Sequence, residues 1–357
     1  MSQVETDQVD TDQVETPARS AEPVRDRLRG AVPPRVAAML VGALLLQLGF
    51  VLSYVGAFHN PQPHRIPIAV AAPQRMAPDA AEKLNGIPGQ PLKATATDEA
   101  TARERLRTGE ISGALIVKPG SRTDTLLVAG SGGASTATAL ETVIEKAEKA
   151  QSRTASVVDA FPAQAGDARG LSSFYLVVGW TVGGYLFAAL LGMSLGARPA
   201  TARGAGRRLL AAVPYAVLSG LGGAAIVGPL LGALNGHFLA LSAIGALVVF
   251  GAAAMTIAFQ VLFGVLGIGV TILLFVVLGN PSAGGAYGPE LLPPFWRALS
   301  PALPNGAATH AVRHTMYFSG HGITVNLAVL TAYALGGALV SVLAAALIRR
   351  RRAAAAA

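Results

Sequence analysis

The stretch from Leu171 to Ala357 contains a single carboxylate, Glu290, among long runs of Leu, Val, Ala, Ile, Phe and Gly. Such runs are expected to lie in a lipid bilayer, because each can form a helix that crosses about 30 Å of hydrocarbon. Proton-driven transporters generally carry Asp or Glu inside the bilayer as the coupling group. The sequence therefore indicates that any transport by this chain draws on another energy source.

The composition supports a membrane protein, since 52% of the residues are hydrophobic, 13% are charged and the mean hydropathy is +0.49. These values exclude an ordinary soluble globular chain. The net charge of +8 does not indicate a nucleic-acid partner, because the basic residues flank apolar runs as orientation signals do. The chain has no cysteine, which excludes disulfides, thiolate metal sites and thiol nucleophiles.

Six apolar runs are predicted to be transmembrane helices. They cover residues 36–58, 171–196, 209–234, 238–258, 261–279 and 323–348. Residues 1–35 precede them as a disordered polar tail with a basic end, and residues 349–357 follow as a basic tail. A cleaved signal peptide is the alternative for the first run, but its apolar core exceeds the usual ~7–15 residues. Between the fourth and fifth runs the turn near Phe259-Gln260 carries no charge, so one kinked or re-entrant element is the alternative there.

Arginines cluster before the first run, between the second and third, and after the sixth. If the amino terminus is cytoplasmic, six crossings place all three clusters on the cytoplasmic side, as the positive-inside rule requires. We therefore expect a multi-pass protein of the cell membrane with both termini cytoplasmic. Residues 59–170 and 280–322 are then extracytoplasmic.

Residues 59–170 are predicted to form a small extracytoplasmic α+β domain inserted between the first two transmembrane helices. Its expected order is strand 66–71, helix 79–84, strand 92–97, helix 98–107, strands 111–117 and 125–128, and helix 134–158. Asp98 is expected to cap the second helix and Gly109 to end it.

Three groups of residues in the membrane half are candidates for function. The basic loop between the second and third runs could dock a cytoplasmic partner, although retention of the loop and contact with anionic lipid would explain its charge equally. The third run has small residues every fourth position, which favours either a sliding or dimer face or static packing within the chain. The proline-rich segment 280–322 is expected to form short, proline-broken helices in the outer interface. The residues are Arg198, Arg203, Arg207 and Arg208 in the loop; Gly220, Ala224, Gly228 and Gly232 in the third run; and Pro281, Gly284, Glu290, Pro293, Trp296, Pro304 and Gly306 in the proline-rich segment.

The arrangement resembles the ABC-2 type transporter permeases, in the branch that includes the phage-infection-protein-like membrane proteins. The resemblance lies in one span, an inserted domain and five further spans, with Asn280-Pro281-Ser282-Ala283-Gly284-Gly285 leading to Leu-Pro-Pro-Phe-Trp-Arg-Ala-Leu and Leu-Pro-Asn-Gly-Ala before the last span. Residues 101–117 are also similar to that family's helix, glycine turn and strand. The inserted domain is far smaller than the long coiled region of the phage-infection-type members, which argues against a receptor role.

The resemblance implies the membrane half of an exporter whose P-loop ATPase is a separate polypeptide. It also implies a homodimer or a heterodimer with a related permease, exofacial re-entrant helices in segment 280–322, and cytoplasmic loops that contact the ATPase. ATP is then bound by the partner, because the glycine-rich stretch 130–136 lacks the Lys that reaches the phosphates.

No catalytic, cofactor or metal site is expected on this chain. His310, His314 and His321 have spacing that could hold a metal, but structural or solvated roles are favoured because no carboxylate accompanies them except Glu290 at a distance. The leading hypothesis is a permease subunit of an ATP-driven exporter for a hydrophobic or amphipathic solute. The alternative is a non-transporting, membrane-anchored surface or assembly protein whose extracytoplasmic domain binds a partner.

Overall fold

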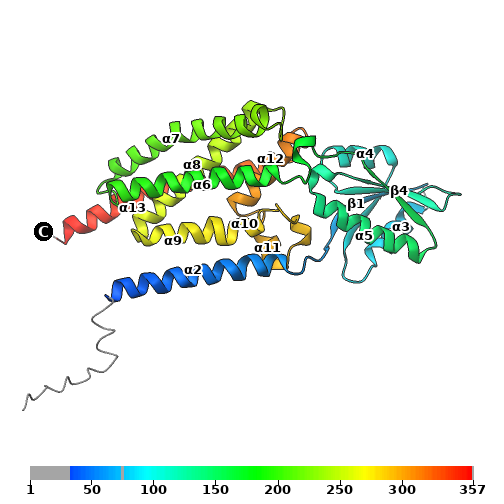
Figure 1. Ribbon diagram of the computed structural model, residues 1–357, viewed down its shortest axis with the longest axis horizontal. Helices are drawn as coiled ribbons and strands as arrows, with labels where there is room; N and C mark the ends of the chain where they lie inside the picture. Colours follow the sequence, from blue (N-terminus) through cyan, green and yellow to red (C-terminus); the bar gives the residue numbers. More distant parts are fainter. Residues whose placement is uncertain (1–32, 74–75, 356–357) are drawn as a thin grey trace, which may run out of the picture. The chain divides into compact units, whose positions relative to one another are not determined.

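The computed structural model describes residues 33–73 and 76–355. The chain divides into two units, and the boundary lies inside helix α2 (Pro34–Phe58), between Leu45 and Leu46. The predicted polar tail and most of the basic segment before α2 lie outside the described residues. The second unit contains a sheet domain and a helix bundle (Figure 1).

The sheet domain contains a mixed sheet of five strands in the order β2-β1-β3-β4-β5. Only β3 and β4 pair antiparallel, and the other three pairs are parallel. The strands are β1 (Ile66–Ala71), β2 (Leu92–Thr97), β3 (Gly113–Ile116), β4 (Thr123–Val128) and β5 (Thr154–Asp159), and the helices are α3 (Met76–Asn85), α4 (Glu99–Arg107) and α5 (Ala134–Ala150).

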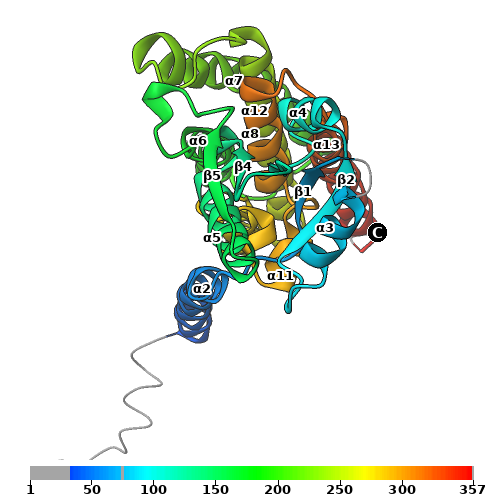
Figure 2. The same ribbon diagram turned by 90° about the vertical axis from the view of Figure 1, so that its right-hand side faces the viewer.

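The alternation of side chains along the strands divides the domain into two cores. Ile66 and Ile68 of β1 pack on the face that α3 and α5 cover, together with Leu140 and Ile144 of α5. Ala69 lies on the opposite face, which α4 covers (Figure 2). Small side chains on that second face let α4 lie close to the sheet.

The predicted helix 98–107 is confirmed, and so is its capping. Asp98 accepts a hydrogen bond from the Thr101 amide at 2.9 Å, and Gly109 takes a left-handed conformation just after the helix. The prediction of one helix over 134–158 is wrong. Helix α5 ends at Ala150, and Thr154–Asp159 form the edge strand β5 beside β4. Ser152 has φ +59, which breaks the helix, and the β-branched Val157 and Val158 favour a strand.

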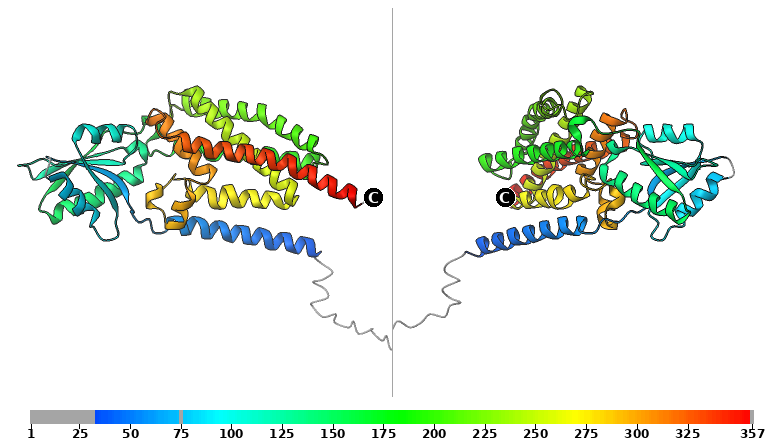
Figure 3. Two further views of the ribbon diagram at one scale, coloured as in Figure 1. Left: turned by 180° about the vertical axis from the view of Figure 1, so that it is seen from behind. Right: turned by 45° about the vertical axis from the view of Figure 1, so that its right-hand side comes forward.

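The bundle consists of α6 (Ser172–Leu195), α7 (Ala202–Ala225), α8 (Phe238–Phe263) and α13 (Thr324–Ala354). Helix α8 is central, because α6, α7 and α13 all pack against it (Figures 1 and 3). The helix backbones approach closely where Gly184 of α6 and Gly220 of α7 face carbonyls of α8, since a methyl group at either glycine would overlap them. In a bilayer, close packing of small residues is a main source of helix association.

Among the described residues, five helices are long and apolar enough to cross a membrane, which makes the chain a multi-pass membrane protein. They are Val36–Phe58, Ser172–Leu195, Ala202–Leu230, Phe238–Phe263 and Thr324–Arg351. The predicted span 261–279 corresponds to a shorter apolar helix, Leu266–Ser282, built from α9 (Leu266–Ile272), a π-helical segment η4 (Leu273–Gly279) and α10 (Asn280–Ser282).

The predicted turn at Phe259-Gln260 is wrong, because α8 continues to Phe263 and the chain turns at Gly264, with φ +64. The Gln260 side chain is fully buried, and its amide donates a hydrogen bond to the Ala188 carbonyl of α6 at 3.2 Å. A polar side chain that finds a partner inside the bundle does not mark the end of a helix.

The segment after α10 confirms the predicted short, proline-broken helices. Pro289, Pro294 and Pro304 stand at the first positions of three helices, where the missing amide is not needed for a helical hydrogen bond. The helices are η5 (Pro289–Leu291), α11 (Pro294–Leu299) and α12 (Pro304–Tyr317).

Near the β5 edge, two buried carboxylates share one arginine. Arg153 donates to Asp124 with Nε at 2.8 Å, and the same Nε lies 3.4 Å from Glu148. Burial raises the pKa of the Glu148 carboxyl to about 7, and the Asp124 carboxylate adds to the shift. Glu148 is therefore protonated in the folded chain over a pH range in which it is ionised in the unfolded chain.

We expect stability to fall as the pH rises from about 4.5 to about 7, because the folded state binds this proton more tightly. Glu148→Gln should flatten this dependence by on the order of 1 kcal/mol. Thermal midpoints of the purified chain at about pH 5 and about pH 7.5 measure it. Glu145→Gln, at a more exposed carboxylate of the same helix, is the control. Equal pH dependence in both variants would contradict the assignment.

Candidate functional site

The basic loop between α6 and α7 contains two arginines that hold the bundle together. The buried Arg208 guanidinium donates to the Gly196 carbonyl at 2.7 Å and to the Leu195 carbonyl at 3.2 Å, and so caps the end of α6. Arg198 donates to the Leu262 carbonyl at the end of α8 at 2.9 Å. Positive charge at a helix carboxyl end is favourable, so these two arginines have an internal structural role.

The other two arginines of the loop, Arg203 and Arg207, are exposed on the first turns of α7. Neither forms an ion pair with any residue that the structure describes. The start of α7, which carries both residues, lies at the end of the bundle away from the sheet domain (Figure 1). These two side chains are therefore the part of the predicted loop that is open to another molecule.

The predicted small-residue face of α7 packs within the chain. Gly220 faces the Ser242 carbonyl of α8, and Ala224 is buried. Gly228 lies in the π-helical segment η3 (Ile226–Leu230), against the Leu234 carbonyl. Gly232 lies beyond that helix, in a turn with φ +65. Static packing thus accounts for Gly220, Ala224 and Gly228, and Gly232 does not continue their face.

The proline-rich segment lies against the sheet domain. The Gln62 backbone amide donates to the Leu291 carbonyl at 3.2 Å, and the His64 backbone amide donates to the Glu290 carbonyl at 2.9 Å. These two hydrogen bonds tie the linker before β1 to η5. Of the predicted residues, Trp296 is buried beside Leu292 and Ala57, and Pro281 is buried at the end of α10. Gly306 leaves no space for a methyl group because the Ser300 carbonyl lies against it. Gly284, Pro293 and Pro304 shape the turns of the same segment.

A buried polar cluster joins α12 to the linker that follows β5. The Arg313 guanidinium donates two hydrogen bonds to the Gly284 carbonyl, each 3.2 Å, and one to the Gly170 carbonyl at 3.4 Å. Asp167, which is 3% exposed, accepts from the Tyr317 hydroxyl at 2.7 Å and from the Ser172 amide at 2.8 Å. We call Arg313, Asp167, Tyr317, Gly170 and Gly284 the α12 cluster.

The positive charge of Arg313 on α12 is opposed by carboxylates from two other segments, the linker after β5 and η5. Burial lowers the pKa of the Arg313 guanidinium, and the Asp167 and Glu290 carboxylates oppose that shift. Burial also raises the pKa of the Glu290 carboxyl and, together with the hydrogen bond to Asp167, that of the Tyr317 hydroxyl. An arginine desolvated to this degree is stable only with such partners, so the cluster fixes where the sheet domain sits on the bundle.

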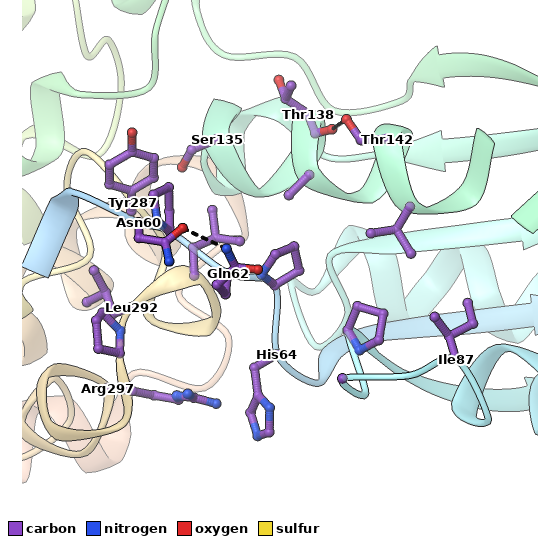
Figure 4. A pocket seen from close by; sticks show the side chains of 18 of the residues that line it. Asn60, Gln62, His64, Ile87, Ser135, Thr138, Thr142, Tyr287, Leu292 and Arg297 are labelled. Atoms are coloured by element: carbon purple, nitrogen blue, oxygen red, sulfur yellow. Dashed lines mark hydrogen bonds between the residues drawn. The ribbon is translucent and has the colours of Figure 1, made fainter. Parts of the chain in front are cut away.

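A large cavity lies between the sheet domain and the proline-rich segment (Figure 4). Its volume is about 1030 Å³, and its walls come from the linker 59–64, the loop 87–91, helix α5 and the segment 287–297. We call it the junction cavity. Among its apolar lining residues are Ile87, Val143, Leu291 and Leu292, and among its polar ones are Asn60, Gln62, Thr138, Thr142 and Tyr287.

The sequence prediction found the segment that forms one wall of the cavity but not the cavity or the α12 cluster. Arg313 was the available signal, since an arginine that follows Ala311-Val312 on a buried helix needs hydrogen-bond partners. Asp167 gave no signal, because it lies in a polar linker whose burial depends on tertiary contacts.

In the part of the chain that the structure describes, no group of three potential metal ligands occurs. The His310 and His314 rings stack at 3.8 Å, and His314 Nδ1 lies 2.8 Å from the His321 carbonyl. In comparisons with known proteins, no family profile, curated protein or solved structure matches the chain.

Asp167→Asn should lower the stability of the chain by about 1–3 kcal/mol, because it keeps the shape of the side chain but removes the buried negative charge that accepts from Tyr317 and Ser172 and favours the charged form of Arg313. Thermal unfolding of the purified protein measures the loss, and hydrogen exchange in residues 164–172 should rise with it. Asp79→Asn, at an exposed carboxylate of α3, is the matched control. If the two variants unfold alike, the cluster does not hold the domain in place.

Proposed function

We propose that the chain is a permease subunit of an ATP-driven exporter for a hydrophobic or amphipathic solute, and that a separate P-loop ATPase supplies the energy. The observation that carries the proposal is the contrast between the two ends of the bundle. One end bears a sheet domain with a large cavity, and the other bears the exposed Arg203 and Arg207. Helices with no acidic residue between these ends suit movement of an apolar solute rather than proton coupling.

In this proposal the membrane is the cell membrane and the chain crosses it six times. Helix Leu266–Ser282 is the fifth crossing, since it runs from the Gly264 turn back to α12. There the Asn305 side-chain amide donates to the Phe275 carbonyl at 3.1 Å and to the Asn280 side chain at 2.8 Å. Seventeen helical residues span roughly 25 Å, slightly less than the hydrocarbon thickness, so local thinning or the adjoining turn accommodates the difference. With six crossings, both termini and the basic loop are cytoplasmic, and the sheet domain is extracytoplasmic.

The cytoplasmic partner docks on Arg203 and Arg207, whereas Arg198 and Arg208 transmit its movement because they tie the loop to the ends of α8 and α6. The permease works as a dimer, with itself or with a related chain. The contact face of that dimer is not the Gly220 face, which packs on α8.

Arg203→Gln with Arg207→Gln should reduce recovery of the ATPase with the tagged chain about tenfold, since two exposed charge contacts at ~0.7 kcal/mol each sum to that factor. The measurement is quantitative mass spectrometry of complexes purified from native membranes in mild detergent. Arg65→Gln with Arg122→Gln, at exposed positions of the sheet domain, removes the same charge from the other end and is the control.

Two results would contradict the proposal. Recovery of no P-loop ATPase with the unaltered chain would favour the membrane-anchored binding protein instead. Equal recovery with both double variants would show that the arginines of the loop only orient the chain in the membrane.

A further inference from the structure

The junction cavity has an unbalanced charge. Four basic side chains line it, namely His59, His64, Lys146 and Arg297, and none of the described lining residues is Asp or Glu. They come from the end of α2, the linker before β1, helix α5 and helix α11. Basic groups that line one cavity from four separate elements, with no described carboxylate among them, favour binding of an anion.

Arg297 and Lys146 are available to bind such an anion. The Arg297 Nε atom is buried and has no hydrogen-bond partner among the described residues. The Lys146 side chain is exposed and takes part in none of the ion pairs in that part of the chain. The Arg297 side chain points toward His64 on one side of the cavity (Figure 4). A buried, unpartnered guanidinium nitrogen costs free energy that a bound oxyanion would recover.

Apart from these basic groups and a few neutral polar side chains, the lining is apolar, and part of it lies next to helix α2. Proline rings, Ile87, Val143 and Leu292 cover much of the wall. His59 is the first residue after α2, and Leu292 packs in a cluster with Ala57 of α2 and Trp296. Tyr287 lines the cavity, and Tyr side chains are enriched at the headgroup level of membrane proteins, which favours a cavity that opens at that level.

We propose that the junction cavity binds one anionic membrane lipid. Arg297, Lys146, His59 and His64 hold its phosphate, and the apolar wall holds part of its acyl chains. The volume of about 1030 Å³ is at the upper end of the ~300–1,000 Å³ typical of ligand sites, which gives room for a headgroup and a chain segment. Binding is a property of this chain alone and does not depend on the exporter proposed above.

The test is calorimetric titration of the purified full-length chain, in a neutral maltoside detergent, with short-chain phosphatidylglycerol below its micelle concentration. Short-chain phosphatidylcholine and inorganic phosphate are titrated in parallel. We expect phosphatidylglycerol to bind at least about tenfold more tightly than either, because only it offers both a net negative charge and acyl chains.

Lys146→Gln with Arg297→Gln should weaken phosphatidylglycerol binding by about tenfold or more, since two charge-assisted contacts are lost. Lys149→Gln is the control, because Lys149 is exposed one turn further along α5 but does not line the cavity. This variant should leave binding unchanged. Lys146→Gln alone should still weaken binding if the Arg297 substitution impairs folding.

Several results would overturn the proposal. Equal binding of phosphatidylglycerol and phosphatidylcholine would show that the basic residues do not select the ligand. Phosphate binding as tight as that of the lipid would show a plain anion site. Undiminished binding by the folded Lys146 and Arg297 variants would place the lipid elsewhere. Loss of the ATPase partner, by contrast, would not affect any of these titrations.

Discussion

The buried Arg313 guanidinium links the two halves of the second unit. It is 7% exposed on helix α12 and donates to carbonyls of two separate loops, and the Asp167 carboxylate opposes the effect of burial on its pKa. Removing such a group from water costs several kcal/mol unless its donors find acceptors, so the two loops whose carbonyls accept from its terminal nitrogens are held in one arrangement. Phe318 follows directly after α12 and packs into the sheet core with Leu106 and Ile111, so the same helix contacts the sheet and carries the arginine. The sheet domain, the proline-rich segment and α6 therefore meet at this one point.

How far the sequence predicts this structure depends on how local each signal is. The apolar runs, the Asp98 cap and the prolines that begin η5, α11 and α12 act within a few residues, and the sequence predicted them. The prediction failed where distant contacts decide. Strand β5 forms because β4 offers an edge, and α8 passes Gln260 because Ala188 of α6 accepts its hydrogen bond. The four arginines of the basic loop are equivalent in the sequence, but Arg198 and Arg208 donate to carbonyls at the ends of α8 and α6, whereas Arg203 and Arg207 are exposed without such a contact among the described residues. The junction cavity needs four segments at once and has no sequence signal.

These contacts suggest how the two ends of the bundle could be connected. Arg208 and Arg198 bind the ends of α6 and α8, and both helices run toward the region where Arg313 and Asp167 hold the sheet domain. In the proposed exporter, a movement imposed on the basic loop would be carried along α6, whose first residue Ser172 donates to Asp167. The junction cavity lies on the far side of this path, next to the proline-rich segment. A rigid cluster between the basic loop and the junction cavity is a physical basis for coupling, because packed elements with fixed hydrogen bonds transmit displacement.

The central claim is that the bundle spans the membrane with the sheet domain outside and the basic loop inside. The chain contains no cysteine, so single cysteines can be introduced without any background labelling. Thr142→Cys on α5, Ala200→Cys in the basic loop and Ala354→Cys at the end of α13 are all at exposed positions. A membrane-impermeant maleimide applied to intact cells should label only the Thr142→Cys variant, and the other two should react only after the membrane is opened. Labelling of Ala200→Cys in intact cells would contradict the orientation. Labelling of both Thr142→Cys and Ala354→Cys, but not of Ala200→Cys, would show that the chain crosses the membrane five times.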